Sequence, residues 1–472
     1  MSSQIHFLLN DCEICMSAHP GTLVLDFLRK KEKLMGTKEG CKEGDCGACT
    51  VLVGELTQGK MHYKPVTSCL MPLGELHGKH LVTVEGLNLT RLTPVQQAIV
   101  DLGATQCGFC TPGIVVSMTG LLMQEGAHID EAGIKKALSG HLCRCTGYRS
   151  LKQTQEDIRE TIGQHTGIEA LIEHQWLPDY FRKIPACLRK IAGPGAANGK
   201  TMPDFFIAGG TDLYVQKGEL LPESRVQVLN LLPEMKGVAA KNGGLRVGAL
   251  TTFEEFAEHP AVVQIIPNIQ EYMHLIASWQ IRNRATLGGN IINASPIGDL
   301  TILLLALESQ LVLQEGKERR TVPLTAFYRG YKQLEKRPEE ILTEILIPKP
   351  QPNIRIHFEK VSKRKCLDIA SVNSAIRVRC EAEIIREVGL AVGGVAPVPL
   401  FLKRTCQFLL GKPVSKTTIQ AAFAVAQREI APINDIRGSA AYKRLLTRQL
   451  LIGHFARLFP ELVKVREFYE TH

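Results

Sequence analysis

Apolar and polar positions alternate in short runs at the start of the chain. Residues 4–9 and 13–18 each predict a strand, and Asn10-Asp11-Cys12 between them has the composition of a hairpin turn. The segment 22–30 instead follows a period of three to four residues, which predicts a helix with Thr22 as its N-cap. This beginning favours a small sheet with one helix packed against it.

The pattern becomes helical after about residue 86. Thr93-Pro94 opens a helix with proline at an early position. Further on, an apolar strand at 204–208 runs into a glycine turn. More helical stretches are expected over residues 113–125, 130–139, 417–429 and 440–458.

Composition adds a size and a class. The 472 residues suffice for about three domains at ~150 residues each. Apolar residues make up 44% and charged residues 22%, which is ordinary for a globular protein with real cores. The net charge of +9 is spread along the chain, so we interpret it as an aid to solubility or to anionic cofactors and disfavour nucleic-acid binding.

The cysteine content points to metal or redox chemistry. The first residues lack a secretory signal pattern. The longest apolar run, residues 300–307, is too short to span a bilayer, so we expect a cytoplasmic protein without membrane segments. In such a chain, 14 cysteines favour metal or redox centres over disulfides.

The first cysteine group has the spacing C-x₄-C-x₂-C, formed by Cys41, Cys46 and Cys49, with Cys69 twenty residues later. This is the spacing of plant-type [2Fe–2S] ferredoxins. Neighbouring glycines, Gly40, Gly44 and Gly47, permit the positive φ angles of a loop that wraps a cluster. A zinc knuckle or buried thiols are the alternatives, but three ligands within nine residues fit zinc poorly. A strand at 50–53 follows the loop.

A second group combines C-x₂-C and C-x-C. Cys107 and Cys110 precede one predicted helix, and Cys143 and Cys145 follow another. Four thiolates brought together in this way could hold zinc. Beside a first iron–sulfur centre, a second [2Fe–2S] cluster is favoured, because zinc is redox-inert and would not extend an electron path. A third pair, Cys12 and Cys15, is not expected to bind metal.

Two glycine turns indicate a bound dinucleotide. Gly209-Gly210-Thr211 ends the strand at 204–208, and the turn 286–290 precedes the segment 294–300. Successive backbone N–H groups in such turns suit phosphate, and two of them could clamp a dinucleotide without a Rossmann fold. The stretch 191–201 nearly matches a P-loop and a G-x-G-x-x-G motif but lacks a required glycine in each, so we predict an ordinary loop.

The flanks of the second cysteine group carry a family resemblance. Gln106-Cys107-Gly108-Phe109-Cys110-Thr111-Pro112-Gly113 and Leu142-Cys143-Arg144-Cys145-Thr146-Gly147-Tyr148, after a plant-type motif, resemble the iron–sulfur part of the molybdenum hydroxylases. The resemblance implies an α+β multidomain protein: a β-grasp [2Fe–2S] ferredoxin domain, a helical-bundle [2Fe–2S] domain and an α+β FAD-binding domain of the PCMH/VAO type with an α+β C-terminal subdomain. The implied ranges are 1–86, 87–165, a linker at 166–200, 201–350 and 351–472.

The same resemblance implies where FAD binds. The first glycine loop and the Thr-x-Gly-Gly-Asn loop would hold its pyrophosphate and ribose, Asp299 would lie near the flavin, and Leu342 and Lys360 match two further family segments. Mammalian members have an aromatic residue stacked on the flavin where this chain has Ile276, with Trp279 close by. The implied cofactor residues are Phe206, Ile207, Ala208, Gly209, Gly210, Thr211, Asp212, Leu213, Thr286, Leu287, Gly288, Gly289, Asn290, Asp299, Leu342 and Lys360.

The family also implies the function. A molybdopterin-binding partner would hydroxylate a purine, and electrons would pass through the Cys107 cluster and then the Cys41 cluster to FAD and NAD⁺. The fusion of clusters and flavin without a molybdenum domain favours the small subunit of a xanthine dehydrogenase, in a dimer of heterodimers with the large subunit. The alternatives are another molybdenum hydroxylase acting on aldehydes or N-heterocycles, a stand-alone iron–sulfur flavoprotein, and a zinc-stapled binding module. We expect no acid–base catalytic residue, and a structural role for His141.

Overall fold

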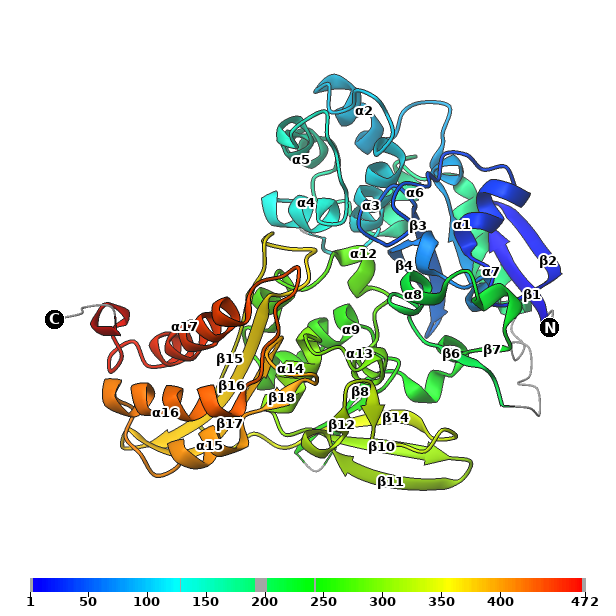
Figure 1. The fold of residues 1–472 in the computed structure, drawn as a ribbon. Coiled ribbons are helices and arrows are strands. Elements are labelled where there is room, and N and C mark those ends of the chain that lie inside the picture. The colour runs from blue at the N-terminus through cyan, green and yellow to red at the C-terminus, as the bar shows by residue number, and fades with distance from the viewer. Residues whose placement is uncertain (1–2, 128, 192–201, 242, 469–472) are drawn as a thin grey trace. The chain divides into compact units, whose positions relative to one another are not determined.

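The computed structural model describes residues 3–127, 129–191, 202–241 and 243–468 (Figure 1). The chain forms two compact units from segments that interleave in the sequence. The first unit comprises Met1–Leu232 and Ala277–Ala285, and the second comprises Pro233–Ile276 and Thr286–His472. The range 201–350, expected as a single flavin domain, is therefore divided between the two units.

The N-terminal part of the first unit is a five-stranded sheet with strand order β2-β1-β5-β3-β4. β1 (Ser3–Leu9) and β2 (Cys12–Ala18) form the predicted hairpin. β5 (His80–Val82) runs parallel to β1 and antiparallel to β3 (Thr50–Thr57), which pairs with β4 (Lys60–Thr67). Apolar side chains from these strands and the following helix form one core, which confirms the β-grasp ferredoxin fold.

The helix predicted over 22–30 has a different start. α1 (Val24–Asp26) continues directly as a π-helical turn, η1 (Phe27–Lys31). Its N-cap is Leu23, which is extended and offers no side-chain cap, so the expected Thr22 cap was wrong. Leu23 forms a β-bridge with Pro72, and this extended pairing delays the helix start.

The second part of the first unit is helical. α2 (Pro94–Asp101) begins as predicted, with a capping box between Thr93 and Gln96. α3 (Thr111–Leu122), α4 (Glu131–Leu138) and α5 (Arg149–Ile162) follow and enclose a shared apolar core. Asp130 caps α4 by accepting the N–H of Gly133.

The range 166–200, expected to be a linker, is largely helical where the structure describes it. α6 (Ile168–Glu173), the 3₁₀ turn η5 (Asp179–Lys183) and α7 (Ile184–Ile191) bury apolar side chains, among them Leu171 and Leu188. A helical face that buries such residues is part of a core rather than an exposed connection. The predicted loop with the two near-miss nucleotide motifs covers residues 191–201; Ile191 ends α7, and 192–201 lie outside the described residues.

A small two-stranded segment completes the first unit together with one helix from later in the sequence. β6 (Phe205–Ile207) pairs in parallel with β7 (Val226–Val228), and α8 (Leu213–Lys217) follows the glycine turn after β6. The short helix α12 (Trp279–Arg282) comes from much later in the sequence but belongs to this unit.

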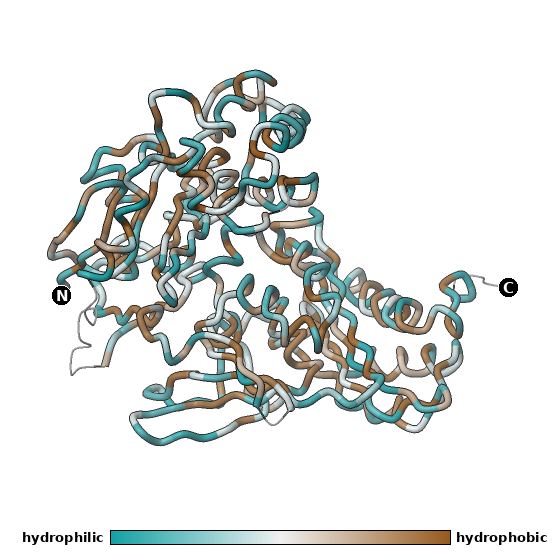
Figure 2. Tube along the Cα trace, turned by 180° about the vertical axis from the view of Figure 1, so that it is seen from behind, coloured by the Kyte–Doolittle hydropathy of each residue, from teal (hydrophilic) through white to brown (hydrophobic). Residues whose placement is uncertain are grey.

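The second unit begins with a five-stranded sheet of order β11-β10-β14-β9-β8. Its strands are β8 (Val238–Lys241), β9 (Gly244–Gly248), β10 (Gln310–Glu315), β11 (Glu318–Pro323) and β14 (Ile341–Ile347). The turn that joins β10 to β11 is hydrophilic (Figure 2). Helices α9 (Phe253–Glu258), α10 (Pro260–Ile265), α11 (Ile269–Met273), α13 (Leu287–Asn293) and α14 (Asp299–Ala306) belong to the same unit.

The C-terminal part of the second unit is a four-stranded sheet of order β15-β16-β17-β18, with helices on both sides (Figure 1). α14 and α17 (Ala440–Leu458) both contact β16 (Val372–Glu381). The other elements are β15 (Arg355–Val361), β17 (Ile384–Gly393), β18 (Leu400–Phe401), α15 (Lys403–Leu409) and α16 (Lys416–Glu429). Within the described ranges, no helix is long and apolar enough to cross a membrane.

Candidate cofactor-binding sites

The first cysteine site lies at one end of the β3–β4 pair. Thr50 of β3 is paired with Thr67 of β4, so Cys49 and Cys69 emerge side by side from the two strands. The hydroxyl of Ser68 donates to the Cys49 carbonyl oxygen at 2.7 Å and ties these ends together. Strand register thus brings together two ligands that lie twenty residues apart in the sequence.

The other two ligands lie on the loop before β3. The Cys41 sulfur accepts the backbone N–H groups of Glu43 at 3.4 Å and Asp45 at 3.3 Å. A hydrogen bond from the Cys46 thiol lowers the pKa of Cys41 to about 5 and raises the pKa of Cys46. The surroundings of Cys41 therefore favour its thiolate, the form that binds metal.

The glycines of this loop act in two ways. Gly44 and Gly47 have φ angles of 81° and 70°, as predicted. Gly40 does not, and the expectation for it was wrong: a Cβ at Gly40 would lie 2.7 Å from the Cys46 sulfur, so glycine provides space for a ligand there.

The second cysteine site is built at two helix starts. Cys110 is the N-cap of α3, and Cys143 lies in the loop before α5. The Tyr148 hydroxyl accepts the Cys143 N–H at 2.9 Å and donates to the His141 carbonyl at 3.0 Å. Thr146 Oγ1 lies 3.1 Å from the Cys143 sulfur. Tyr148 therefore braces the C-x-C loop, a role that the sequence motif alone did not indicate.

The eight thiols associate in pairs. Hydrogen bonds join Cys41 to Cys46, Cys49 to Cys69, Cys107 to Cys145 and Cys110 to Cys143. A single tetrahedral zinc needs four ligands around one point, whereas a two-iron cluster takes a pair of thiolates at each iron. Two pairs at each site thus fit [2Fe–2S] better than zinc.

The two cysteine loops are in direct contact. The N–H of Leu142 donates to the Cys46 carbonyl oxygen at 3.0 Å. A Cβ at Gly47 would lie 2.4 Å from both the Gly140 carbonyl oxygen and His141 Nδ1. His141 is buried, which lowers its pKa to about 3, and its Nε2 lies 2.7 Å from Ser117 Oγ. The imidazole is therefore a neutral packing element between the loops.

The first glycine turn, in the residues Phe206–Leu213, belongs to the first unit. Gly210 has a φ of 73°, and a Cβ there would lie 2.7 Å from the Leu70 carbonyl oxygen. Leu70 follows the ligand Cys69, so the turn lies against the first cysteine site. Tyr214 anchors the next helix by donating its hydroxyl to the Gly21 carbonyl at 2.8 Å.

The second glycine turn, Thr286–Asn290, belongs to the second unit. Thr286 caps α13 by accepting the Gly289 N–H at 3.1 Å. A Cβ at Gly288 would lie 2.7 Å from the Ala249 carbonyl oxygen, so glycine permits the close approach of β9's exit loop. Asn290 Oδ1 accepts the N–H and hydroxyl of Thr301, which fixes the start of α14.

The second unit also brings Asp299 and Lys360 together. Lys360 Nζ lies 2.7 Å from Asp299 Oδ2, and its side chain is 2% exposed. Asn373, which sequence reasoning missed, donates to Asp299 Oδ1 at 2.6 Å. It is fully buried on β16, opposite Gly393, and no local pattern marks it.

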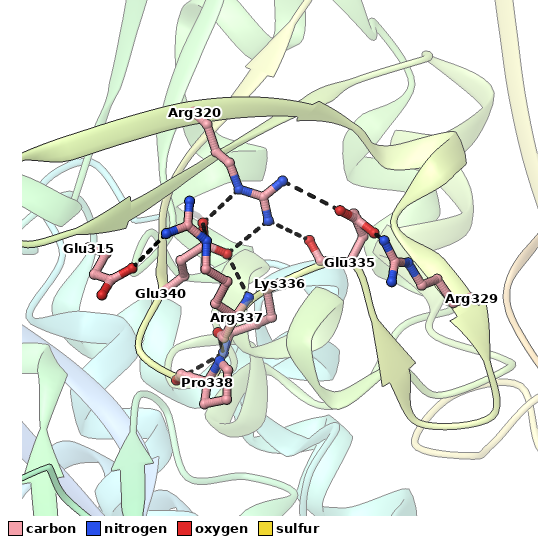
Figure 3. Close-up of polar contacts among 8 residues, drawn as sticks. All are labelled: Glu315, Arg320, Arg329, Glu335, Lys336, Arg337, Pro338 and Glu340. Atoms are coloured by element: carbon pink, nitrogen blue, oxygen red, sulfur yellow. Dashed lines mark hydrogen bonds and ion pairs between the residues drawn. The ribbon is translucent and has the colours of Figure 1, made fainter.

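Leu342 is buried on β14, two residues after Glu340. Glu340 belongs to a network of charged side chains (Figure 3). Arg320 binds Glu340 through two hydrogen bonds, of 2.6 and 2.8 Å, and the Arg337 N–H adds a third of 2.7 Å. These donors, Arg320 first, lower the pKa of Glu340 to about 2. The network holds the turn before β14 in one shape.

The residues considered for flavin stacking are both buried. Ile276 is 2% exposed in the second unit, and Trp279 is 1% exposed in the first. Trp279 joins the apolar core of the helical part, where Lys136 Nζ lies 5.0 Å from its ring centroid. Its aromatic face is therefore used inside the first unit.

Family models match four consecutive parts of the chain. They are a 2Fe-2S iron–sulfur cluster binding domain (residues 9–73), a [2Fe-2S] binding domain (83–156), an FAD binding domain in molybdopterin dehydrogenase (184–350) and a CO dehydrogenase flavoprotein C-terminal domain (357–458).

Curated relatives match almost the whole chain. Xanthine dehydrogenase of Emericella nidulans is 29% identical over 97% of this chain, and aldehyde oxidase 1 of Bos taurus is 29% identical over 98%. The chain spans only 38% and 40% of their lengths. Among solved structures, a chain of carbon monoxide dehydrogenase from Hydrogenophaga pseudoflava is 30% identical, with a TM-score of 0.50 over 52% of this chain and 86% of that one. The chain therefore belongs to the molybdenum hydroxylase family and contains its two [2Fe–2S] domains, its FAD-binding domain and the C-terminal domain that follows.

Proposed function

We propose that this chain is the electron-transfer subunit of a xanthine dehydrogenase. In this proposal it passes electrons from a molybdopterin-binding partner, which oxidises hypoxanthine and xanthine to urate, to NAD⁺. The observation that carries the proposal is the contact chain within the first unit. The second cysteine site touches the first through Leu142 and Cys46, and the first touches the glycine turn through Leu70 and Gly210.

The residues of the chain have distinct tasks in this proposal. When bound, the clusters carry single electrons and FAD collects two. The eight thiols bind iron, and the backbone N–H groups at Cys41 stabilise sulfur charge. The two glycine turns are the elements assigned to the phosphates and ribose of FAD. Asp299, fixed by Lys360 and Asn373, is a rigid, partly exposed carboxylate for the flavin end of the cofactor.

The xanthine assignment draws support from the whole-chain relative in Emericella nidulans. The bovine aldehyde oxidase relative covers an equal share of the chain and supports a second candidate: the corresponding subunit of an enzyme that oxidises aldehydes or N-heterocycles. The two candidates differ in the partner, because the substrate would bind at its molybdenum centre. Purification of the tagged chain with its partner, followed by assays with xanthine and with an aldehyde, distinguishes them.

The cofactors are tested first on the purified chain. We expect a brown protein with about four iron atoms and one FAD per chain, assayed together with zinc on one sample. Zinc in place of iron, or a colourless protein without flavin, would overturn the electron-transfer role. With the partner present, xanthine-dependent reduction of NAD⁺ is the expected activity, and reduction of oxygen alone would contradict the proposed acceptor.

A further inference from the structure

Arg284 connects two parts of the first unit that are far apart in the sequence. Its side chain is 2% exposed, and it follows α12 on the returning segment 277–285. One guanidinium nitrogen donates to Glu75 Oε2 at 3.0 Å and to the Gly209 carbonyl oxygen at 2.6 Å. A single buried arginine therefore binds both the ferredoxin sheet's connecting turn and the first glycine turn.

The charge of Arg284 belongs to a buried network. Glu75 lies 3.3 Å from Lys79 Nζ, and Lys79 lies 2.6 Å from Glu55. The side chains of Glu75 and Lys79 are each 8% exposed. Charges thus alternate from Glu55 through Lys79 and Glu75 to Arg284. Removing one member of such a buried network leaves its neighbour without compensation.

The backbone around Arg284 is packed as tightly as its side chain. A Cβ at Gly209 would lie 2.1 Å from the Arg284 carbonyl oxygen. Ile207 and Tyr214, on either side of the turn, share an apolar cluster with Cys49, Cys69 and Leu70. The glycine turn is therefore held between Arg284 on one side and two ligands of the first cysteine site on the other.

We propose that Arg284 is a positioning residue that clamps the first glycine turn onto the Cys49 and Cys69 side of the first cluster. The clamp keeps the FAD-binding turn at a fixed distance from the cluster, which favours FAD binding and rapid electron exchange between them. This inference rests on the proposed function, because it takes the turn as an FAD-binding element and the cysteines as cluster ligands.

The test uses the full chain with its cofactors. Arg284→Met removes the charge and the donors at similar size, Arg284→Lys keeps the charge, and Glu75→Gln keeps an acceptor for Arg284. Arg379→Met is the matched control, because it also removes an arginine that is paired with a glutamate, Glu387, but it lies in the second unit and has no part in the proposed FAD site. The readouts are FAD dissociation by fluorescence, the rate at which photoreduced flavin reduces the first cluster, and both cluster EPR signals.

We expect Arg284→Met to raise the Kd for FAD and to slow the reduction of the first cluster, each by about tenfold or more, as befits loss of a charged hydrogen bond. The second-cluster signal should be unchanged, and Arg284→Lys should recover part of both effects. Arg379→Met should leave the Kd for FAD and the electron-transfer rate unchanged. Equal effects of Arg379→Met and Arg284→Met, or wild-type values in Arg284→Met, would overturn the inference.

Two outcomes separate this inference from the proposed function. A wild-type chain that binds neither iron nor FAD would remove the proposed function before any variant is made. A wild-type chain that binds both, with Arg284→Met unaffected, would remove the clamp alone. If Arg284→Met does not fold, Glu75→Gln tests the clamp in its place. We expect it to slow reduction of the first cluster about threefold. An unchanged rate would overturn the clamp.

Discussion

The two cysteine sites of the first unit each have four cysteines, but different elements of the fold hold these cysteines in place. In the first, Cys49 and Cys69 are buried and are fixed by the register of two paired strands. In the second, Cys107 and Cys145 are exposed, and the loops depend on helix starts and on the Tyr148 hydroxyl. Strand pairing thus fixes two ligands of the first site, whereas helix starts and loops carry all four ligands of the second.

This difference suggests a division of tasks. The first site lies against the first glycine turn, which is the FAD-binding element of the proposed function. The second site has two exposed ligands, Cys107 and Cys145, and in the proposed function it faces the partner. In the proposed electron path, the site supported by paired strands is therefore at the FAD end, and the site with two exposed ligands is at the partner end.

Gly47 is where the two sites depend on each other, and its replacement has the largest expected effect. In Gly47→Ala, the new Cβ meets both Gly140 and His141 at a φ of 70°. We expect a loss of about 3 kcal/mol or more in unfolding free energy and depletion of iron at both sites. Urea unfolding and iron assays measure this.

Gly108→Ala is the matched control. Gly108 also lies between two ligands and has a φ of 78°, but a Cβ there meets no atom within 4 Å. Gly108→Ala should lower the free energy of unfolding by only about 1 kcal/mol, which is the cost of holding alanine in a left-handed backbone conformation. Similar losses in the two variants would show that the contact between the loops contributes little.

Acid reduces the stability of the sheet that supports the first site. Burial lowers the pKa of His80 to about 4, while its Nδ1 lies 2.6 Å from the Tyr63 hydroxyl. Between pH 6.5 and about 4 the unfolded chain binds a proton that the folded chain does not, so stability falls as pH falls through this window. Across this window, the low pKa of His80 reduces the free energy of unfolding by about 3 kcal/mol. His80→Gln should flatten the pH dependence of urea unfolding, and an unchanged slope would refute the assignment.

Tyr148→Phe affects only the second site. It removes the acceptor of the Cys143 N–H and the donor to the His141 carbonyl, for a loss of about 1 kcal/mol. We expect a chelator to bleach the second cluster faster while the first keeps its EPR signal. Tyr180→Phe removes a hydroxyl that donates to the Gly86 carbonyl, away from the cysteines, and serves as the control. Faster loss at both sites would contradict separate supports.

Local sequence predicted the local parts of these sites. The spacing of the cysteines, the capping box at Thr93 and the hairpin at Asn10 all involve residues close together in the chain, so the pattern sufficed. Thr22 is not the cap because Leu23 pairs with Pro72, a residue far away in the sequence, and this pairing keeps Leu23 extended. Pairings of this kind leave no periodic signal.

The residues missed were those that act at long range. Arg284 lies on the segment 277–285, which returns to the first unit from within the second, and Asn373 on β16 donates a hydrogen bond to Asp299 on α14. A charged residue in a polar turn is ordinary on a surface. Only the fold shows that Arg284 is buried between Glu75 and Gly209.

The smallest expected effect concerns the cysteines outside both sites. Cys12 and Cys15 repeat the C-x₂-C spacing of Cys107 and Cys110, but both are exposed on β2, and each sulfur contacts a neighbouring polar side chain, Asp11 and Gln4 respectively. Replacing both with serine should leave iron content, both EPR signals and FAD affinity unchanged. A loss of iron would mean that spacing alone recruits metal here, and that the supports compared above matter less than the thiols themselves.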